Sequence, residues 1–206
     1  MTTPLGAEPE ADPAREAVRL ALLTAAERCF GQFGIAKTTM EDIARAAGVS
    51  RATVYRYFAD REALVLASVI RRARSDIPRA RRHLDRFGAF GDKIVEGLVR
   101  NVERGRRDPV VQLLVNSDQP ALAARVLGGE GVSHQLSYEL WEPVLAAAQQ
   151  TGEMNPALDR RMACTWLARV TLIMVAQEKS TQLSPDELRA EFRTFVIPAF
   201  LPPALA

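Results

Sequence analysis

The chain is poor in the residues that most often build metal and redox sites. Its 206 residues include two cysteines, Cys29 and Cys164, and two histidines, His83 and His134. No Cys-x-x-Cys pair and no closely spaced pair of histidines occurs, so we predict no metal site and no cofactor. Each cysteine is expected to be a small buried apolar residue; a redox-sensing pair is the alternative.

No stretch of the chain is apolar enough to cross a membrane. The most apolar run, residues 162–177, is shorter than the roughly 20 residues that a spanning helix needs, and Arg169 interrupts it. An early apolar stretch behind a basic start, the mark of a secretory signal, is also missing. We therefore expect a cytoplasmic protein with no membrane partner.

Strand patterns and the usual signatures of enzymes are missing too. Apolar residues recur at helical spacing, which predicts an all-α fold. There is no nucleophile elbow, phosphate loop or metal cluster, and Gly-Gly-Glu-Gly at 128–131 lacks the spacing of a dinucleotide fingerprint. We therefore predict that the protein is not an enzyme.

Positive charge is concentrated in the first third of the chain. Residues 13–87 hold 15 Lys or Arg against 8 Asp or Glu, whereas residues 88–206 hold 12 against 14. A basic segment on a nearly neutral body indicates that one end of the protein meets a polyanion. Chance clustering on a solvated helix face is the alternative.

Residues 39–58 predict two short helices joined by a tight turn. Thr39 is a good N-cap for a helix that Gly48 ends, and Ser50 can cap the next helix. This is the helix-turn-helix arrangement. In its second helix, Val54 and Phe58 are four residues apart and are expected to face the core.

The other side chains of that second helix form a polar surface that suits a DNA major groove. They fall into pairs four residues apart: Arg51 with Tyr55, Ala52 with Arg56, and Thr53 with Tyr57. Arginine can hydrogen-bond guanine edges, methyl groups can meet a thymine methyl, and hydroxyls can reach phosphates.

The segment TTMEDIARAAGVSRATVYRYFADREAL resembles the signature of the tetracycline-repressor (TetR) family of bacterial transcription regulators. The resemblance covers roughly residues 15–65. Arg61 stands where the family usually has lysine, so a cation remains with a different geometry. The resemblance implies a helix-turn-helix DNA-binding domain over residues 14–62 and an effector-binding and dimerisation domain over 63–206. Residues 1–13 are rich in proline and acidic residues, which predicts a disordered tail.

The resemblance also implies roles for individual residues. Base contacts are expected from Arg51, Ala52 and Arg56, phosphate contacts from Thr39, Thr53, Tyr57 and Arg61, and either kind from Tyr55. Simpler interpretations stay open for three of them: Thr39 as a helix cap only, Tyr55 as packing against the first helix, and Arg56 as merely solvated.

Residues 63–206 show no comparable signature. A helix from residue 60 is expected to kink or end at Pro78, and further helices are expected near 92–105, 108–116, 119–128, 132–151, 156–179 and 185–200. Large apolar residues mixed with a few polar ones suggest a ligand pocket. Its predicted lining is Leu113, Asn116, Tyr138, Trp141, Leu145, Trp166, Val170 and Met174, with ordinary core as the alternative.

The resemblance to the TetR family implies that the last two long helices, near 156–179 and 185–200, form half of a four-helix bundle between two subunits. The expected dimer contacts are Arg169, Ile173, Leu188, Phe192, Phe195 and Phe200, with an intramolecular core as the alternative. The function implied is a homodimeric repressor that binds a palindromic operator in double-stranded DNA and is released by a small apolar or amphipathic effector. An activator or nucleoid-type binder with the same head, and an enzyme with an accessory DNA-binding head, are the alternatives.

Overall fold

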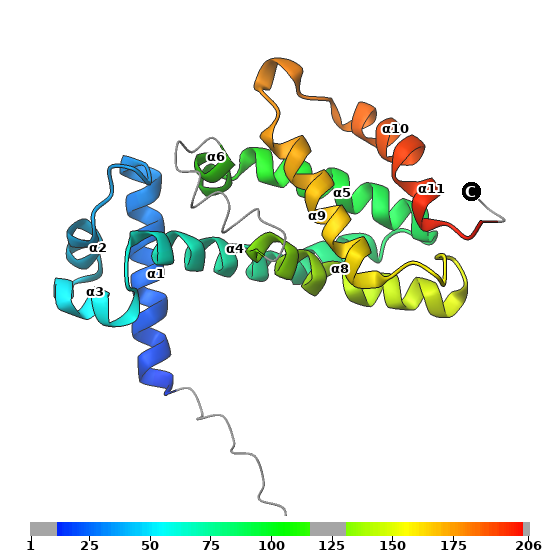
Figure 1. The fold of residues 1–206 in the computed structure, drawn as a ribbon. Coiled ribbons are helices and arrows are strands. Elements are labelled where there is room, and N and C mark those ends of the chain that lie inside the picture. The colour runs from blue at the N-terminus through cyan, green and yellow to red at the C-terminus, as the bar shows by residue number, and fades with distance from the viewer. Residues whose placement is uncertain (1–11, 116–130, 204–206) are drawn as a thin grey trace, which may run out of the picture. The chain divides into compact units, whose positions relative to one another are not determined.

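The computed structural model describes residues 12–115 and 131–203, and these residues form helices with no strand among them. The expectation of an all-helical fold is confirmed (Figure 1). The helices are α1 (Pro13–Phe33), α2 (Met40–Ala47), α3 (Arg51–Tyr57), α4 (Arg61–Leu84), α5 (Phe90–Arg107), α6 (Pro109–Val115), α8 (Val132–Thr151), α9 (Arg160–Ala176), the 3-10 turn η1 (Lys179–Thr181), α10 (Pro185–Phe195) and α11 (Ile197–Phe200).

The chain divides into two compact units, one ending at Ser68 and one beginning at Val69. We call the first unit the head and the second the body. Helix α4 belongs to both, because it begins at Arg61 and continues without interruption to Leu84. The domain boundary expected after residue 62 falls within the first turn of this helix.

In the head, α1, α2 and α3 fold around a small apolar core. Leu22, Leu23 and Phe30 of α1 are buried, as are Ile43 of α2 and Val54 of α3. Asp12 caps α1 by accepting a hydrogen bond from the Ala14 N–H at 3.0 Å, and proline occupies the first position of the helix. Figure 1 shows α2 and α3 side by side against α1.

The turn between α2 and α3 has the expected chemistry. Gly48 has φ +69° and ψ +30°, the left-handed conformation that ends a helix most easily at glycine. Ser50 then caps α3 by accepting from the Thr53 N–H at 3.1 Å. Val54 and Phe58 are buried, as predicted, so one side of α3 is fixed to the core.

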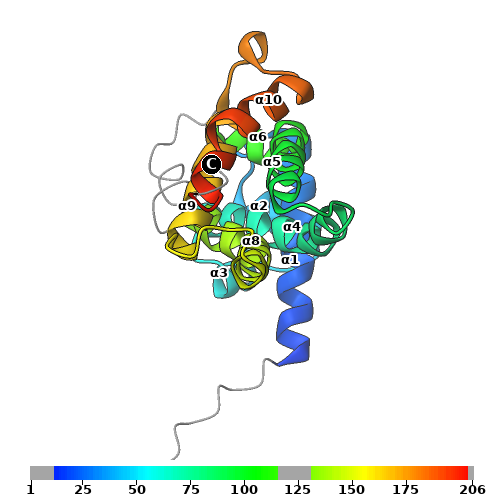
Figure 2. The same cartoon turned by 90° about the vertical axis from the view of Figure 1, so that its right-hand side faces the viewer.

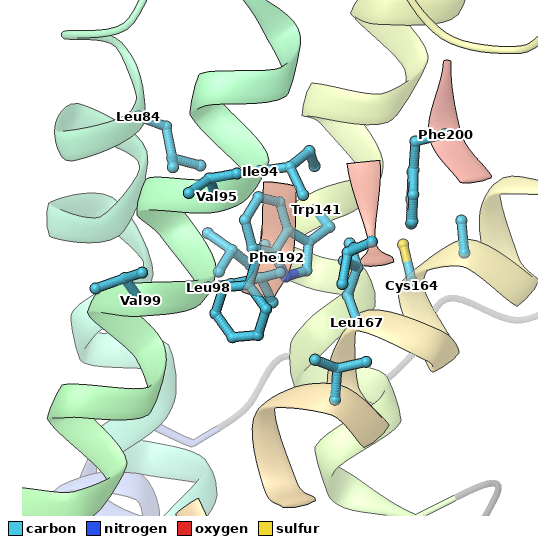
Figure 3. Packing of buried hydrophobic residues seen from close by; sticks show 14 of the residues in the cluster. Leu84, Ile94, Val95, Leu98, Val99, Trp141, Cys164, Leu167, Phe192 and Phe200 are labelled. Carbon is cyan, nitrogen blue, oxygen red and sulfur yellow. The ribbon is translucent and has the colours of Figure 1, made fainter. Parts of the chain in front are cut away.

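The body has one contiguous apolar core, built mainly from α5, α8, α9 and α10. Trp141 of α8 is its largest buried side chain. Figure 3 shows the indole in the middle of the cluster, with Leu98 and Ile94 of α5 to one side and Leu167 of α9 to the other. Figures 1 and 2 show α9 packed against α8 and α5, and α10 lying along α5.

Pro78 lies inside α4. Of the two outcomes expected there, an end of the helix is wrong: α4 remains helical through Pro78, because the helix can lose one backbone hydrogen bond while packing holds the rest. Helix α9 exposes Met162, Trp166 and Ile173, and it buries Ala163, Cys164, Leu167, Ala168, Val170, Met174 and Val175. The helix expected at 119–128 lies outside the described residues. Within the described part, no helix is both long and apolar enough to span a bilayer.

Candidate DNA-binding surface and effector cavity

Helix α3 presents one buried and one open side. Val54 is buried, whereas Arg51, Ala52, Tyr55 and Arg56 are exposed, and Thr53 and Tyr57 are half-buried. The open side therefore carries two guanidinium groups, a phenol and a methyl group on a helix of two turns. This inventory matches the groups that read base edges in a major groove.

The cationic side chains of α3 lie against its tyrosines. Arg51 Nη2 donates to the Tyr55 hydroxyl at 3.3 Å, and its guanidinium carbon lies 5.4 Å from the centre of the Tyr55 ring. The hydrogen bond to Tyr55 raises the pKa of Arg51. Likewise, the guanidinium carbon of Arg56 lies 5.5 Å from the centre of the Tyr57 ring. Such contacts limit the freedom of both arginines before any partner arrives.

Thr39 caps α2 and remains exposed. Its hydroxyl accepts from the Asp42 N–H at 3.1 Å and donates to the Asp42 carboxylate at 2.6 Å, while its own N–H donates to that carboxylate at 3.0 Å. Bonds from the Thr39 side chain and backbone lower the pKa of Asp42. The interpretation of Thr39 as a cap is thus confirmed, and its exposed position leaves a phosphate contact open as a prediction.

A shallow hollow on the head brings three of the predicted residues together. Its lining includes Thr39, Tyr55 and Arg61. Arg61 Nη1 donates to the Ala36 carbonyl at 2.7 Å, so one arm of this guanidinium ties α4 to the loop before α2. Ala52, Arg56 and Tyr57 are not part of this hollow.

Sequence reasoning passed over Lys37 in the same loop. This lysine is exposed, lies two residues before Thr39, and makes no side-chain bond within the part of the chain that the structure describes. A free cation at the edge of a basic surface is a further candidate for a phosphate contact. A loop lysine outside the signature segment gave no sequence signal that would single it out.

The body contains a cavity of about 180 Å³ bordered by five helices. Its residues recur at helical spacing, for example Val69, Ala73, Ile77 and Ala80 on α4, so each helix contributes one face. The lining is mostly apolar. Its polar side chains are Asp76, Asn101, Arg104, Ser133, Ser137 and Thr171.

An ion-pair cluster borders this cavity. Arg100 makes two hydrogen bonds to the Asp76 carboxylate, at 2.8 and 2.9 Å, and Arg104 Nε lies 3.2 Å from the same group. Burial would raise the pKa of Asp76, but the Arg100 bonds and the nearby arginine charges outweigh burial and lower that pKa. Asp76 is therefore a carboxylate, and it joins α4 to α5.

Comparison with known proteins agrees with this architecture. The family model described as "Bacterial regulatory proteins, tetR family" matches residues 22–68. The HTH-type transcriptional regulator Rv1255c of Mycobacterium tuberculosis is 34% identical over 197 residues, covering 90% of this chain and 86% of that protein. The chain belongs to the tetR family. The family resemblance inferred from the signature segment is confirmed, and the chain is a DNA-binding transcription regulator of a non-enzymatic family.

Solved structures show the same fold over most of this TetR-family chain. The TetR family repressor AlkX from Dietzia sp. strain DQ12-45-1b superimposes with a TM-score of 0.65 at 24% identity, covering 87% of this chain and 93% of AlkX. A TetR-family transcriptional regulator of Pectobacterium atrosepticum gives a TM-score of 0.70 at 19% identity, covering 93% of this chain and 98% of the other.

The TetR-family body places the predicted pocket residues in several different surroundings. Trp141 lines the cavity. Leu145, Val170 and Met174 lie in the core, Trp166 is exposed on α9, and Tyr138 lines a separate shallow hollow. The Leu113 side chain and Asn116 lie outside the described residues. Sequence cannot separate core from cavity lining, because both use apolar residues at the same helical spacing.

The predicted dimer residues divide into two groups. Leu188, Phe192 and Phe200 are buried within the body, so they pack inside one chain. Arg169, Ile173 and Phe195 are exposed, and Phe195 exposes 75% of its surface. On α9 the exposed residues Met162, Trp166, Arg169 and Ile173 follow spacings of four, three and four, which forms one stripe along the helix.

Proposed function

We propose that this TetR-family regulator is a repressor that acts in the cytoplasm, binds a palindromic operator as a homodimer, and leaves it when a small molecule occupies the body cavity. The observation that carries the proposal is the division of α3 into a buried side and a side that exposes Arg51, Ala52, Tyr55 and Arg56. Its structural relative AlkX is described as a repressor, which favours repression over activation.

In this proposal Arg51, Ala52 and Arg56 read base edges, while Thr39, Thr53, Tyr57 and Arg61 contact phosphates; Tyr55 can do either. Arg51 is held at the first turn of α3, the end of a recognition helix that enters the groove. Arg61 keeps donors beyond the one that Ala36 accepts, and those donors can meet a phosphate.

Dimerisation would supply the second reading helix. The stripe formed by Met162, Trp166, Arg169 and Ile173 has the spacing of a helix–helix seam, and Phe195 on α10 adds a large exposed aromatic ring. Large exposed apolar side chains on a soluble chain mark interaction surfaces. Two copies would place their reading helices about 34–36 Å apart, one turn of DNA.

Helix α4 would transmit the effect of ligand binding in the cavity to the DNA-binding helices. It contributes Asp76 to the cavity wall and runs unbroken back to Arg61 in the head. An apolar or amphipathic effector that binds better when α4 is displaced would shift the population away from the DNA-binding form. A shift from 1:99 to 99:1 needs about 5.5 kcal/mol of differential affinity.

Gel shifts with operator and scrambled duplexes across a salt series test the DNA contacts. Arg51→Ala should lower operator affinity by about tenfold to hundredfold and reduce the preference for operator over scrambled DNA. Arg61→Ala should weaken binding to both duplexes alike and reduce the salt slope by about one. Arg107→Ala, an exposed change in the body, is the control. An unchanged operator preference in Arg51→Ala would refute base reading by this residue.

Sedimentation velocity tests the dimer. Ile173→Asp places a charge in the middle of the α9 stripe and should convert the dimer to monomer at micromolar concentration. Arg161→Glu changes charge on the same helix away from the stripe and should leave the mass unchanged. A wild-type chain that sediments as a monomer, or an Ile173→Asp dimer of wild-type strength, would rule out this interface. A reporter fused to the operator separates repression from activation when the gene is deleted.

A further inference from the structure

We propose, building on the effector-controlled function above, that the body cavity takes a small carboxylate with an apolar body, and that Asn101 and Arg104 hold its carboxylate group. Both residues lie on α5, three positions apart, and both line the cavity. Residues at this spacing share one face of a helix, so the two donors are presented to the same space.

The polar side chains of the cavity wall differ in whether they are already bonded. Ser137 donates to the Cys164 carbonyl at 2.7 Å, and Thr171 donates to the Leu167 carbonyl at 2.8 Å. The side chains of Asn101 and Ser133 make no hydrogen bond to any residue that the structure describes. The Asn101 amide carries two N–H donors and a carbonyl acceptor, so it can bond to a ligand group in the cavity.

The charges around the cavity leave a surplus of donors. Asp76, the one acidic residue among the described lining, is shared by Arg100 and Arg104. Arg104 Nη2 donates to the Arg72 carbonyl at 3.2 Å, whereas its Nη1 has no bond to a described residue. Two guanidinium groups thus face one carboxylate. A second carboxylate, which only accepts hydrogen bonds, would balance both the charge and the donors.

The volume limits the apolar part of the ligand. A cavity of about 150 Å³ is large enough for benzene, so about 180 Å³ holds a single ring or a short chain with one small substituent. The surrounding side chains, among them Ile77, Leu140 and Trp141, supply apolar contacts for that body.

Isothermal titration of the full-length protein with matched probes tests the proposal. Benzoate, phenol and toluene share a ring and differ in the head group; octanoate and octan-1-ol form a second pair. At least one carboxylate should bind at least tenfold more tightly than its neutral counterpart. Asn101→Leu and Arg104→Gln should weaken that carboxylate at least tenfold and change the neutral probe less than twofold. Arg107→Gln, which removes an exposed cation of the same helix that is not part of the cavity lining, should leave the ratio unchanged.

A near-isosteric variant guards against loss of folding. Asn101→Asp adds negative charge at the same place, so it should abolish carboxylate binding and keep the neutral probe, with thermal unfolding as the check on folding. Neutral probes that bind as tightly as carboxylates, no binding of either carboxylate, or an unchanged carboxylate affinity in Asn101→Asp would each overturn the proposal. These outcomes are separate from the failure of operator selection in the gel shifts, which would instead overturn the proposed function.

Discussion

Gly97 of α5 touches the indole ring of Trp141 so closely that no side chain fits between the two helices. A Cβ atom built on Gly97 would lie 2.3 Å from Trp141 Cη2 and 2.7 Å from Leu84 Cδ2. Real Cβ atoms do not approach other atoms this closely, so a side chain at this position would force the buried indole or α5 to shift. The absence of a side chain at Gly97 is therefore what allows α5 and α8 to meet.

Gly97→Ala should destabilise the protein by about 1–3 kcal/mol, the usual cost of overpacking a core. Urea unfolding of the body measures the effect. Gly91→Ala on the same helix is the control, because its Cβ would meet the nearest atom, Ile197 Cγ2, at an ordinary 3.6 Å. Equal stability of the two variants would show that Trp141 moves aside without cost.

The head could be predicted from sequence because its signals are local. Thr39, Gly48 and Ser50 each act on the backbone within a few residues, and the structure places each at the expected helix end. The confirmed burial of Val54 and Phe58 follows from helical spacing alone. Local chemistry thus fixed both the turn and the side of α3 that is exposed.

The body could be predicted only in outline, because its decisive relationships are distant in sequence. Phe192 and Phe195 both belong to an apolar pattern, yet the first is buried and the second is exposed. Asn101 and Asp76 acquire a shared setting only when α4 and α5 pack together. Periodicity identifies an apolar face but not which neighbour covers it, so core, cavity and exposed stripe could not be separated.

A substitution at Gly48 would measure the free-energy cost of the left-handed backbone conformation in the turn between α2 and α3. A Cβ at Gly48 would meet no atom within 4 Å, so substitution acts through the positive φ alone. Gly48→Ala should therefore lose about 1–2 kcal/mol of stability in the head. Gly31→Ala also meets no atom within 4 Å but lies in α1, where alanine should stabilise by about 0.5–1 kcal/mol. Thermal unfolding should give opposite signs for the two variants, and equal signs would contradict the assignment.

Burial of Cys164 makes stability depend on pH in the alkaline range. Burial raises the pKa of this thiol to about 12, whereas an unfolded cysteine titrates near 8.5. The stability that the buried neutral thiol contributes is fully present below about pH 8.5. It declines as pH rises toward 12, because only the unfolded chain releases the proton. Between pH 8.5 and 10 the free energy of unfolding should fall by about 1–2 kcal/mol more in the wild type than in Cys164→Ala. Thr165→Ala keeps the thiol, so its free energy of unfolding should depend on pH as that of the wild type does. If the free energy of unfolding of Cys164→Ala ran parallel to that of the wild type across this pH range, the thiol would not be buried and neutral.

Arg106 of α5 hydrogen-bonds a backbone carbonyl at the C-terminal end of α9. Its Nε and Nη2 donate to the Met174 carbonyl at 3.3 and 3.2 Å, and its Nη1 donates to the Leu183 carbonyl at 2.8 Å. Met174 lies in the last turn of α9, where carbonyls lack partners within the helix. A cation at this position also interacts favourably with the helix dipole. The arginine therefore joins α5, the end of α9 and the segment before α10.

Arg106→Met keeps an unbranched apolar stem and removes the guanidinium donors, so it should lower the free energy of unfolding by about 1.5–3 kcal/mol. Arg107→Met is the matched control, since Arg107 is exposed and, among the described residues, pairs with Glu103 one turn away, a contact worth less than about 0.5 kcal/mol. Urea titrations of the two variants, with hydrogen exchange of the α9 amides, separate the contributions. Exchange at the end of α9 should accelerate in Arg106→Met alone, because its last carbonyls then lose their outside partner; equal exchange in both variants would mean that solvent replaces the guanidinium at no cost.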